Sequence, residues 1–212
     1  MIYVQGPDVV FRKVDECDLA DLAELRSEEW RNFHRVRFVG DRDQADWFDS
    51  TRGSHDQIHL VAIRDYDAVP FGMEQMVGVR YGVFSLTNVD WISRVATATW
   101  GVFKGHRGHG LGKKIVAAGV EVAFQVFNLR RIECEILAHN LPSIQVAVAA
   151  GFECEGVKRQ AVWKPGGYVN SHVFGLLRDG HTNAGDCVPL SELSASQDGP
   201  SEEEAISEEV IV

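Results

Sequence analysis

A glycine-rich segment with several cationic side chains offers the clearest chemistry in this chain. It reads His106-Arg107-Gly108-His109-Gly110-Leu111-Gly112-Lys113-Lys114. Glycine tolerates positive φ and lets a ligand approach the backbone closely, so such a segment can turn several N–H groups toward one point. A helix that begins at the same place directs the positive end of its dipole there as well. The segment is therefore predicted to bind an anion such as a phosphate group.

The glycine segment lies between a predicted strand and a predicted helix. Residues 91–103 are rich in β-branched and aromatic side chains, which is typical of a strand. Over 111–127, one apolar stripe repeats at helical spacing and consists of Leu111, Ile115, Ala118, Val122 and Val126. Residues 130–137 then alternate as a second strand. This order predicts a right-handed βαβ unit whose two strands are parallel.

The remaining segments predict one mixed α/β domain around this unit. Further strands are expected over residues 8–14, 59–64, 76–86, 152–163 and 168–177, with turns at 87–90 and 164–167. Shorter helices are expected after Asp15 or Asp18, over 43–48, and from a cap at Asn140 to Gly151. The last two strands are expected to form an antiparallel hairpin.

Size and charge limit the classes of protein. The chain has 212 residues and 45% hydrophobic content, which is enough for one domain with a sizeable core. It shows no apolar run of membrane-spanning length and no signal-peptide pattern, so we expect a cytoplasmic protein with no membrane partner. The net charge is −10, but nine acidic residues and no Lys or Arg follow Arg178, so residues 1–178 carry about −1. A basic face for nucleic acid is therefore not expected.

The acidic end and the metal-binding residue types each receive a simple interpretation. Residues 179–212 contain few large apolar side chains, so we predict a disordered acidic tail after a domain that spans 1–178. The four cysteines are widely spaced and form no CxxC pair, which indicates reduced thiols. His106 and His109 have no carboxylate or third histidine nearby in sequence, so no metal is predicted.

Taken together, these motifs resemble the Gcn5-related N-acetyltransferases (GNAT), which transfer an acyl group from acetyl-CoA to an amine. The family loop of Gln or Arg, two residues, Gly, one residue, and Gly or Ala is matched by residues 107–112. Asn140-Leu141-Pro142-Ser143 and Gly151-Phe152-Glu153-Cys154-Glu155-Gly156 resemble the N-x-x-S and G-F-x-x-E-G signatures of the RimJ/RimL-like ribosomal-protein-alanine acetyltransferase branch. The closing hairpin is similar to that branch as well, with Asn170 where Asp is usual.

The resemblance implies the GNAT acyl-CoA N-acyltransferase fold, a central mixed sheet that is largely antiparallel and has one splayed strand pair. It also implies acetyl-CoA as co-substrate, with the pantetheine arm lying between the splayed strands. A pyrophosphate and a 3′-phosphate suit a cradle of backbone amides at a helix N-terminus. The residues that the resemblance assigns to acetyl-CoA are Val102, Phe103, Arg107, Gly108, His109, Gly110, Leu111, Gly112, Lys113, Asn140 and Ser143.

Direct attack by an amine needs a donor for developing negative charge and a base for the amine proton. The resemblance assigns Ser143 as the donor to the thioester sulfur; the alternative is a structural serine in the first turn of a helix. Many family members carry a Glu in the strand before the loop, but that position is Thr99 here. The base is then a water relay or another residue, and we favour His139, beside Asn140, for its placement and its pKa range. The other candidates are Glu74, Asp90, Tyr168 and His172.

The sequence thus predicts an acetyl-CoA-dependent N-acetyltransferase that acts on a primary amine. The acceptor is a protein N-terminal α-amine or a small-molecule amine, expected in a cleft lined by residues 26–50 and 159–170. The alternative is a CoA-binding or interaction module without turnover, which the missing strand Glu and the acidic tail favour. Dimers occur in the branch, so a homodimer is compatible with the resemblance.

Overall fold

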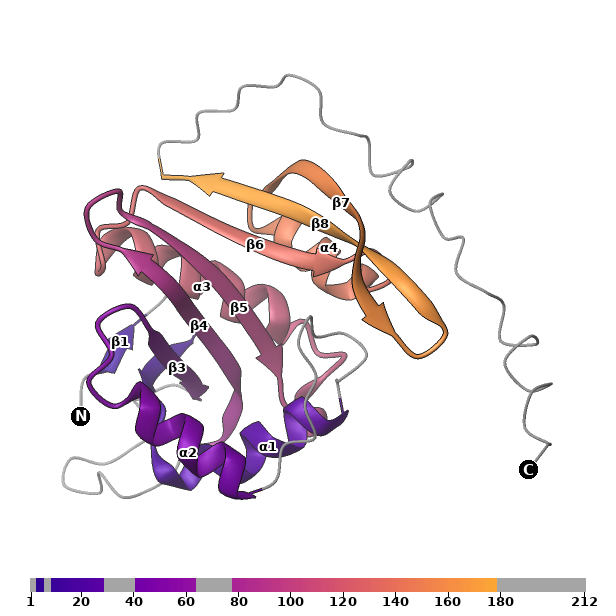
Figure 1. Cartoon of the computed structure of the whole chain (residues 1–212). Helices are drawn as coiled ribbons and strands as arrows, with labels where there is room; N and C mark the ends of the chain where they lie inside the picture. Colours follow the sequence, from indigo (N-terminus) through magenta and orange to yellow (C-terminus); the bar gives the residue numbers. More distant parts are fainter. Residues whose placement is uncertain (1–2, 6–8, 29–40, 64–77, 179–212) are drawn as a thin grey trace, which may run out of the picture.

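The computed structural model describes residues 3–5, 9–28, 41–63 and 78–178, which form one eight-stranded sheet with helices on both faces (Figure 1). The strand order is β1-β2-β3-β4-β5-β6-β8-β7. The strands are β1 (Tyr3–Gln5), β2 (Val10–Lys13), β3 (Ile58–Ile63), β4 (Arg80–Asp90), β5 (Val95–Val102), β6 (Arg131–Leu137), β7 (Glu153–Lys164) and β8 (Gly167–Leu177). The α-helices are α1 (Leu19–Glu28), α2 (Asp41–Thr51), α3 (Leu111–Gln125) and α4 (Leu141–Ala149). Among these helices, none has the length and apolar character of a membrane span.

Among the described strands, only one neighbouring pair is parallel, and it is also the pair that splays. Val95, Ala96 and Thr97 of β5 pair with Arg131, Ile132 and Glu133 of β6, and the two strands then continue without further pairing. The ribbons diverge toward their carboxyl ends (Figure 1). All other strand pairs are antiparallel. The predicted mixed fold with a parallel βαβ unit and a splayed pair is therefore confirmed.

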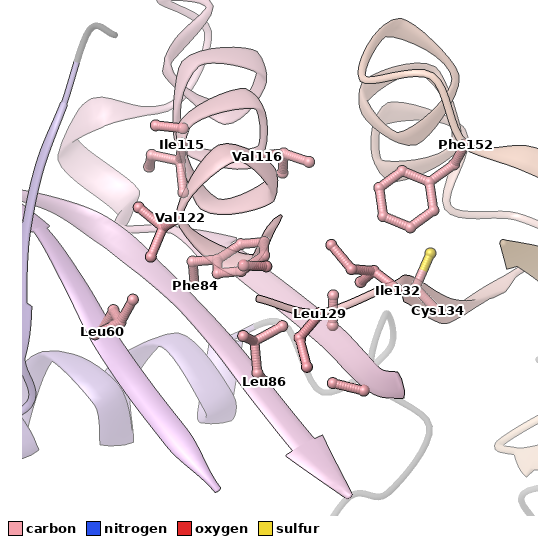
Figure 2. Close-up of a cluster of buried hydrophobic side chains, with 14 of the residues drawn as sticks. Leu60, Phe84, Leu86, Ile115, Val116, Val122, Leu129, Ile132, Cys134 and Phe152 are labelled. Carbon is pink, nitrogen blue, oxygen red and sulfur yellow. The ribbon is translucent and has the colours of Figure 1, made fainter. Parts of the chain in front are cut away.

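Strand alternation gives the sheet two cores, one on each face. On the face covered by α3 and α4, Phe84 and Leu86 of β4 pack with Ile115 and Val122 of α3 (Figure 2). On the face covered by α1, residues of the opposite parity pack with Leu22 and Leu25; they include Val61 of β3, Val83 of β4 and Phe103. Up to the irregularity after Thr87, a residue's parity in β3, β4 or β5 therefore decides which helices its side chain contacts.

Most predicted elements are confirmed, with small shifts of their ends. Helix α3 ends two residues before the predicted end, and α2 contains the predicted 43–48 helix. Asn140 caps α4, because its Oδ1 accepts a hydrogen bond from the Ser143 N–H at 3.3 Å. Asp15 caps the short 3₁₀ helix Glu16–Asp18 that leads into α1. Strand β1 was not predicted, and the start of the predicted 76–86 strand lies outside the described residues.

The turn predicted at 87–90 is wrong, because β4 continues through Asp90 and the chain turns over residues 91–94. The Asp90 carboxylate accepts the N–H groups of Ile92 and Ser93 and the Ser93 hydroxyl, which closes the turn after Asp90. Asn88 has φ of +52° and sits in an irregularity of the strand pairing. The next strand accordingly begins at Val95 and not at Trp91.

A buried ion pair fixes the start of α1 against the sheet. The Arg12 guanidinium donates to both oxygens of Asp18, at 2.6 and 2.7 Å, and the Asp18 side chain is fully buried. Arg80, at the start of β4, lies 3.5 Å from the same carboxylate and 2.8 Å from Asp21. Removing one partner of such a buried pair leaves an uncompensated charge, so these contacts hold α1 at a defined place over β4.

Packing of α3 on β4 predicts the effect of one substitution. A Cβ at Gly119 would lie 2.5 Å from the Phe84 ring, which is fully buried. Gly119→Ala should lower the free energy of unfolding by about 1–3 kcal/mol because the ring or the helix must shift. The matched control is Gly112→Ala in the same helix, where a Cβ meets Val146 and Val102 only at ordinary contact distances of 3.5 and 3.6 Å. Urea unfolding measures both; equal stability of the two variants would contradict the packing argument.

Candidate active site

The glycine loop that connects β5 to α3 is open and has the backbone conformation that glycine favours. Gly108 and Gly110 have φ of +79° and +74°, and a Cβ added at either would meet nothing within 4 Å. Gly110 is the N-cap of α3, and no described side chain caps this helix. The first N–H groups of an α-helix generally have no intrahelical acceptor. Here the Lys113 N–H donates to the Gly110 carbonyl oxygen at 3.2 Å, so the N–H groups of Leu111 and Gly112 are the ones that can face a ligand. The loop therefore has the chemistry and the space of an anion site.

The loop, the end of β5 and α4 converge at one place. The Arg107 Nε donates to the Val102 carbonyl oxygen at 3.0 Å, which holds the loop against the end of β5. A Cβ at Gly112 would lie 3.5 Å from the Val146 side chain of α4 and 3.6 Å from the Val102 side chain. The structure therefore brings the predicted anion loop to the mouth of the gap between β5 and β6.

Backbone geometry decides which groups of β5 face this gap. The Phe103 N–H donates to the Tyr81 carbonyl at 3.0 Å, so Phe103 and Tyr81 form a hydrogen-bonded pair of the β4–β5 ladder. Such pairs alternate with non-bonded pairs along an antiparallel ladder, so the backbone groups of Val102 point away from β4, toward the gap. Phe103 also accepts from the His106 N–H at 2.9 Å, and its side chain is buried. Of the two predicted contacts with the pantetheine arm, only Val102 has this backbone orientation.

The other residues predicted to bind acetyl-CoA lie on two sides of the gap. His109 and Lys113 are exposed and Leu111 is half-buried, all at the start of α3. Asn140 and Ser143 are half-buried at the start of α4, which follows the carboxyl end of β6. Asn140 caps α4, as predicted from the sequence.

The candidate bases differ in their placement. His139 is exposed, immediately before the Asn140 cap, and Tyr168 is exposed at the end of the β7–β8 hairpin. Asp90, the last residue of β4, pairs with Val95 at the start of β5, which is the end of β5 farther from the glycine loop. We therefore discard Asp90 as a base. His172 is completely buried, and burial lowers its pKa. Glu74 lies outside the described residues.

The structure also shows a polar row that the sequence analysis missed. His59 of β3 pairs with Ser85 of β4, and Ser85 pairs with Thr99 of β5, so the three side chains share the α1 face of the sheet. The His59 Nδ1 lies 2.9 Å from the Ser85 Oγ. The Trp47 ring of α2 packs edge-on against His59, with 4.8 Å between ring centroids. A signal was present in the sequence, since His59 is the one polar residue in the otherwise apolar strand β3.

The surroundings of His59 keep its imidazole neutral. Burial, together with the positive charges of Arg26 and Lys13, lowers the pKa of His59 to about 4. Arg26 lies over the Trp47 ring, 4.3 Å from its centroid, and donates to Gln44 at 3.0 Å. His59 is therefore an uncharged hydrogen-bonding group at neutral pH.

A cavity of about 350 Å³ lies beside the residues that precede the glycine loop. Helix α1 lines it with Asp21, Glu24 and Leu25, and the opposite wall contains Phe103 and the 3₁₀ helix Lys104–His106. Asp21 is paired with Arg80, whereas Glu24 is exposed. The predicted acceptor cleft at residues 26–50 and 159–170 does not coincide with this cavity, and residues 29–40 of it lie outside the described part.

Among the described residues, no group of three His, Cys, Asp or Glu side chains is arranged to hold a metal ion. Cys17, Cys134 and Cys154 are free thiols, and Cys187 is outside the described residues. Burial raises the pKa of the Cys134 thiol, so it is an uncharged part of the core. The chemistry of the site therefore rests on backbone amides, hydroxyls and imidazoles.

A splayed parallel pair with an open glycine loop at its mouth defines the class of acyl-CoA N-acyltransferases. A family model described as "Acetyltransferase (GNAT) domain" matches residues 8–153, and the chain belongs to this family. It is an N-acetyltransferase by this membership, and GNAT acetyltransferases use acetyl-CoA.

Individual proteins similar to this chain agree with that assignment. The probable N-acetyltransferase YjcK of Bacillus subtilis is 25% identical over 186 residues, which cover 82% of this chain and 96% of YjcK. The uncharacterized N-acetyltransferase p20 of Bacillus licheniformis is 26% identical over 97 residues, covering 46% of this chain and 54% of p20. The crystal structure of spermidine N-acetyltransferase from Vibrio cholerae, in complex with CoA and spermine, superposes with a TM-score of 0.72 at 15% identity, covering 81% and 96% of the two chains. At that identity, the superposition shows the fold.

The lowered pKa of His59 predicts a pH-dependent loss of stability. An unfolded histidine has a pKa near 6.5, so between pH 6.5 and 4 the unfolded chain binds the proton and the folded chain does not. The contribution of His59 to the free energy of unfolding is thus fully present above pH 6.5, and it falls by about 1–3 kcal/mol in total as the pH drops toward 4. Urea unfolding at pH 7.5, 5.5 and 4.5 should show that the free energy of unfolding falls less with decreasing pH in His59→Gln than in the parent. Equal losses would show that His59 titrates normally in the fold.

Proposed function

We propose that this protein transfers an acetyl group from acetyl-CoA to a primary amine by direct attack of the amine on the thioester. The observation that carries the proposal is the convergence of the open glycine loop, the end of β5 and the start of α4 on one gap. An anion held at the loop and an extended arm lying along β5 would bring an acyl group between the two strands.

We assign the acetyl-CoA site to the two helix starts and the end of β5. The amides after Gly110 and the side chain of Lys113 would hold phosphate oxygens, since helix N-termini and cations both favour anions. Gly108 and Gly110 leave room for this approach. The backbone of Val102 faces the gap and can pair with amide groups of the arm. Asn140 lies across the gap, where its amide group can contact the arm in addition to capping α4.

Two residues at the start of α4 receive chemical roles. Ser143 has its backbone N–H committed to the Asn140 cap, which leaves its hydroxyl as the group that can donate to the thioester sulfur as negative charge develops there. His139, two residues after β6 ends, is the base predicted from the sequence. Ser143, the hydrogen-bond donor, thus lies in the first turn of α4, where the helix dipole stabilises the leaving thiolate.

The acceptor is an amine, and two kinds are compatible with the chain. The resemblance of residues 140–143 and 151–156 to the RimJ/RimL-like branch supports a protein N-terminal α-amine. The structural neighbours from Vibrio cholerae are spermidine acetyltransferases, and one is described as dodecameric, which supports a small cationic amine and an oligomer. Glu24 at the cavity beside α1 is a carboxylate that would attract either cation. We assign the catalytic domain to residues 1–178 and regard 179–212 as an acidic tail.

The test of this function is a thiol-release assay with acetyl-CoA and a panel of amines that includes N-terminal peptides and spermidine. Turnover with at least one amine is expected. Gly112→Trp should abolish acetyl-CoA binding in calorimetry, because the indole would fill the space between α3, Val102 and Val146. Gly105→Ala, at a position where a Cβ meets nothing within 4 Å, is the control that should bind normally. Unchanged affinity of Gly112→Trp would refute the binding site, and tight binding without turnover on every amine would favour the inactive module.

The role of Ser143 predicts a selective loss of rate. Ser143→Ala should lower kcat by roughly 10- to 100-fold because the leaving sulfur loses its donor, whereas acetyl-CoA affinity should change by less than about threefold. Steady-state kinetics and calorimetry on the same preparation measure the two quantities. Ser143→Thr, which keeps the hydroxyl, is the matched control. A rate for Ser143→Ala equal to that of the parent would remove Ser143 from the mechanism.

A further inference from the structure

The polar row on the α1 face begins where the pairing of β5 with β6 ends. Thr97 is the last residue of β5 that pairs with β6, and Thr99 is the next residue of β5 on the same face. Thr99 is exposed, in contrast to its buried neighbour Ala98 on the other face. Thr99 therefore stands at the point where the gap opens toward α1 and α2.

From Thr99, hydroxyl and imidazole groups continue across two strands. Directly opposite residues on one face of an antiparallel pair have Cβ atoms about 4.5–5.5 Å apart, a separation that one water molecule or an amine nitrogen can span between hydroxyls. Ser85 is opposite Thr99, and its Oγ is 2.9 Å from the His59 Nδ1. A group at the gap can thus exchange a proton with His59 through Ser85.

The tautomer of His59 gives this exchange a direction. The His59 Nε2 lies 3.3 Å from the Gln57 Oε1, an atom that only accepts hydrogen bonds. This contact favours the tautomer that carries its proton on Nε2, which leaves Nδ1 as an acceptor for the Ser85 hydroxyl. This arrangement, a hydroxyl bonded to an imidazole that a third group orients, activates a hydroxyl as a proton carrier.

We propose that Ser85 and His59, in place of the sequence-predicted base His139, carry away the proton that the acceptor amine loses, with Thr99 marking the entrance of this path. The inference rests on the proposed function. The acceptor nitrogen forms a bond with the thioester carbonyl carbon, and the C–S bond breaks with its electron pair on sulfur. The amine proton passes to the Ser85 Oγ as the Ser85 proton passes to the His59 Nδ1. The imidazolium returns its proton to water, and a proton from water neutralises the thiolate, so the net products are an amide and a thiol.

The cations around His59 disfavour its protonated form, so His59 can pass a proton on but does not retain it. Arg26 from α1 and Lys13 from β2 both disfavour the imidazolium, and Trp47 from α2 shields the ring. A proton that reaches Nδ1 is therefore released quickly. In this arrangement Ser85 is the residue that touches the acceptor nitrogen or its bridging water, and His59 acts through Ser85 as a positioning residue.

Kinetics on four variants test the path. Ser85→Ala and His59→Gln should each lower kcat by about 100-fold, the usual contribution of a positioned proton acceptor, with KM for both substrates and acetyl-CoA affinity within about twofold of the parent. Ser85→Thr keeps the hydroxyl and should restore kcat to within about threefold. Thr87→Val is the matched control, because Thr87 lies two residues along β4 on the same face and bonds to the Thr97 carbonyl. A kcat for Ser85→Ala within threefold of the parent, or a Ser85→Thr variant as slow as Ser85→Ala, would overturn the proposal.

A second measurement separates this proposal from the proposed function. Long-range ¹H–¹⁵N NMR on the parent, with His59 assigned by comparison with His59→Gln, reports which ring nitrogen carries the proton. The Nε2–H form is expected, and the Nδ1 resonance should shift in Ser85→Ala, which removes its hydrogen-bond donor. An Nδ1–H form would overturn the relay whether or not the enzyme turns over. Absence of turnover on every amine would refute the proposed function, while the NMR result would still decide the arrangement of the row.

Discussion

The end of backbone pairing between β5 and β6 is the constraint on which the site depends. Buried backbone N–H and C=O groups need hydrogen-bond partners. Because β5 and β6 separate after three residue pairs, the backbone groups along the gap have no partner on the neighbouring strand. The next α-helix after β5 is α3, and the next after β6 is α4, so both helices begin at the carboxyl edge of this gap. Their N-termini bring two positive dipole ends to one place. The same divergence thus supplies a slot for an extended ligand and a field that favours negative charge.

The two cores hold the diverging strands apart. Phe84 lies on Gly119 of α3 with no room for a Cβ, and Gly101 on the other face lies beneath Leu25 with a similar restriction of 2.7 Å. These close contacts fix α3 and α1 on opposite faces of β4 and β5. Ile132, Cys134 and Ile136 of β6 belong to the same buried cluster as residues of α3 and α4 (Figure 2). Packing against the helices therefore holds the strands on both sides of the gap.

Local sequence patterns were sufficient to predict much of this arrangement, but they did not predict the register between distant strands. The stripe from Leu111 to Val126 and the Asn140 cap depend on residues within one or two turns, so the sequence shows them directly. The turn after β4 was misplaced because Asn88 and Asp90 are both turn-forming residues, and only the side-chain contacts of Asp90 with Ile92 and Ser93 decide between them. The polar row joins residues 26 positions apart, and no local pattern contains the register that aligns His59 with Ser85.

Replacing a strand carboxylate by Thr99 changes which amines the site favours. A carboxylate would attract an ammonium ion and take its proton, whereas the row of Thr99, Ser85 and His59 is uncharged and has Arg26 beside it. An ammonium ion is therefore not stabilised at the row, so the amine must reach it as the free base. A protein α-amine has a pKa near 7.7–8.0 and is partly neutral at physiological pH, whereas an amine with a pKa near 10.4 is almost wholly protonated. In the proposed relay, the uncharged row beside Arg26 therefore favours a protein α-amine over a more basic acceptor amine.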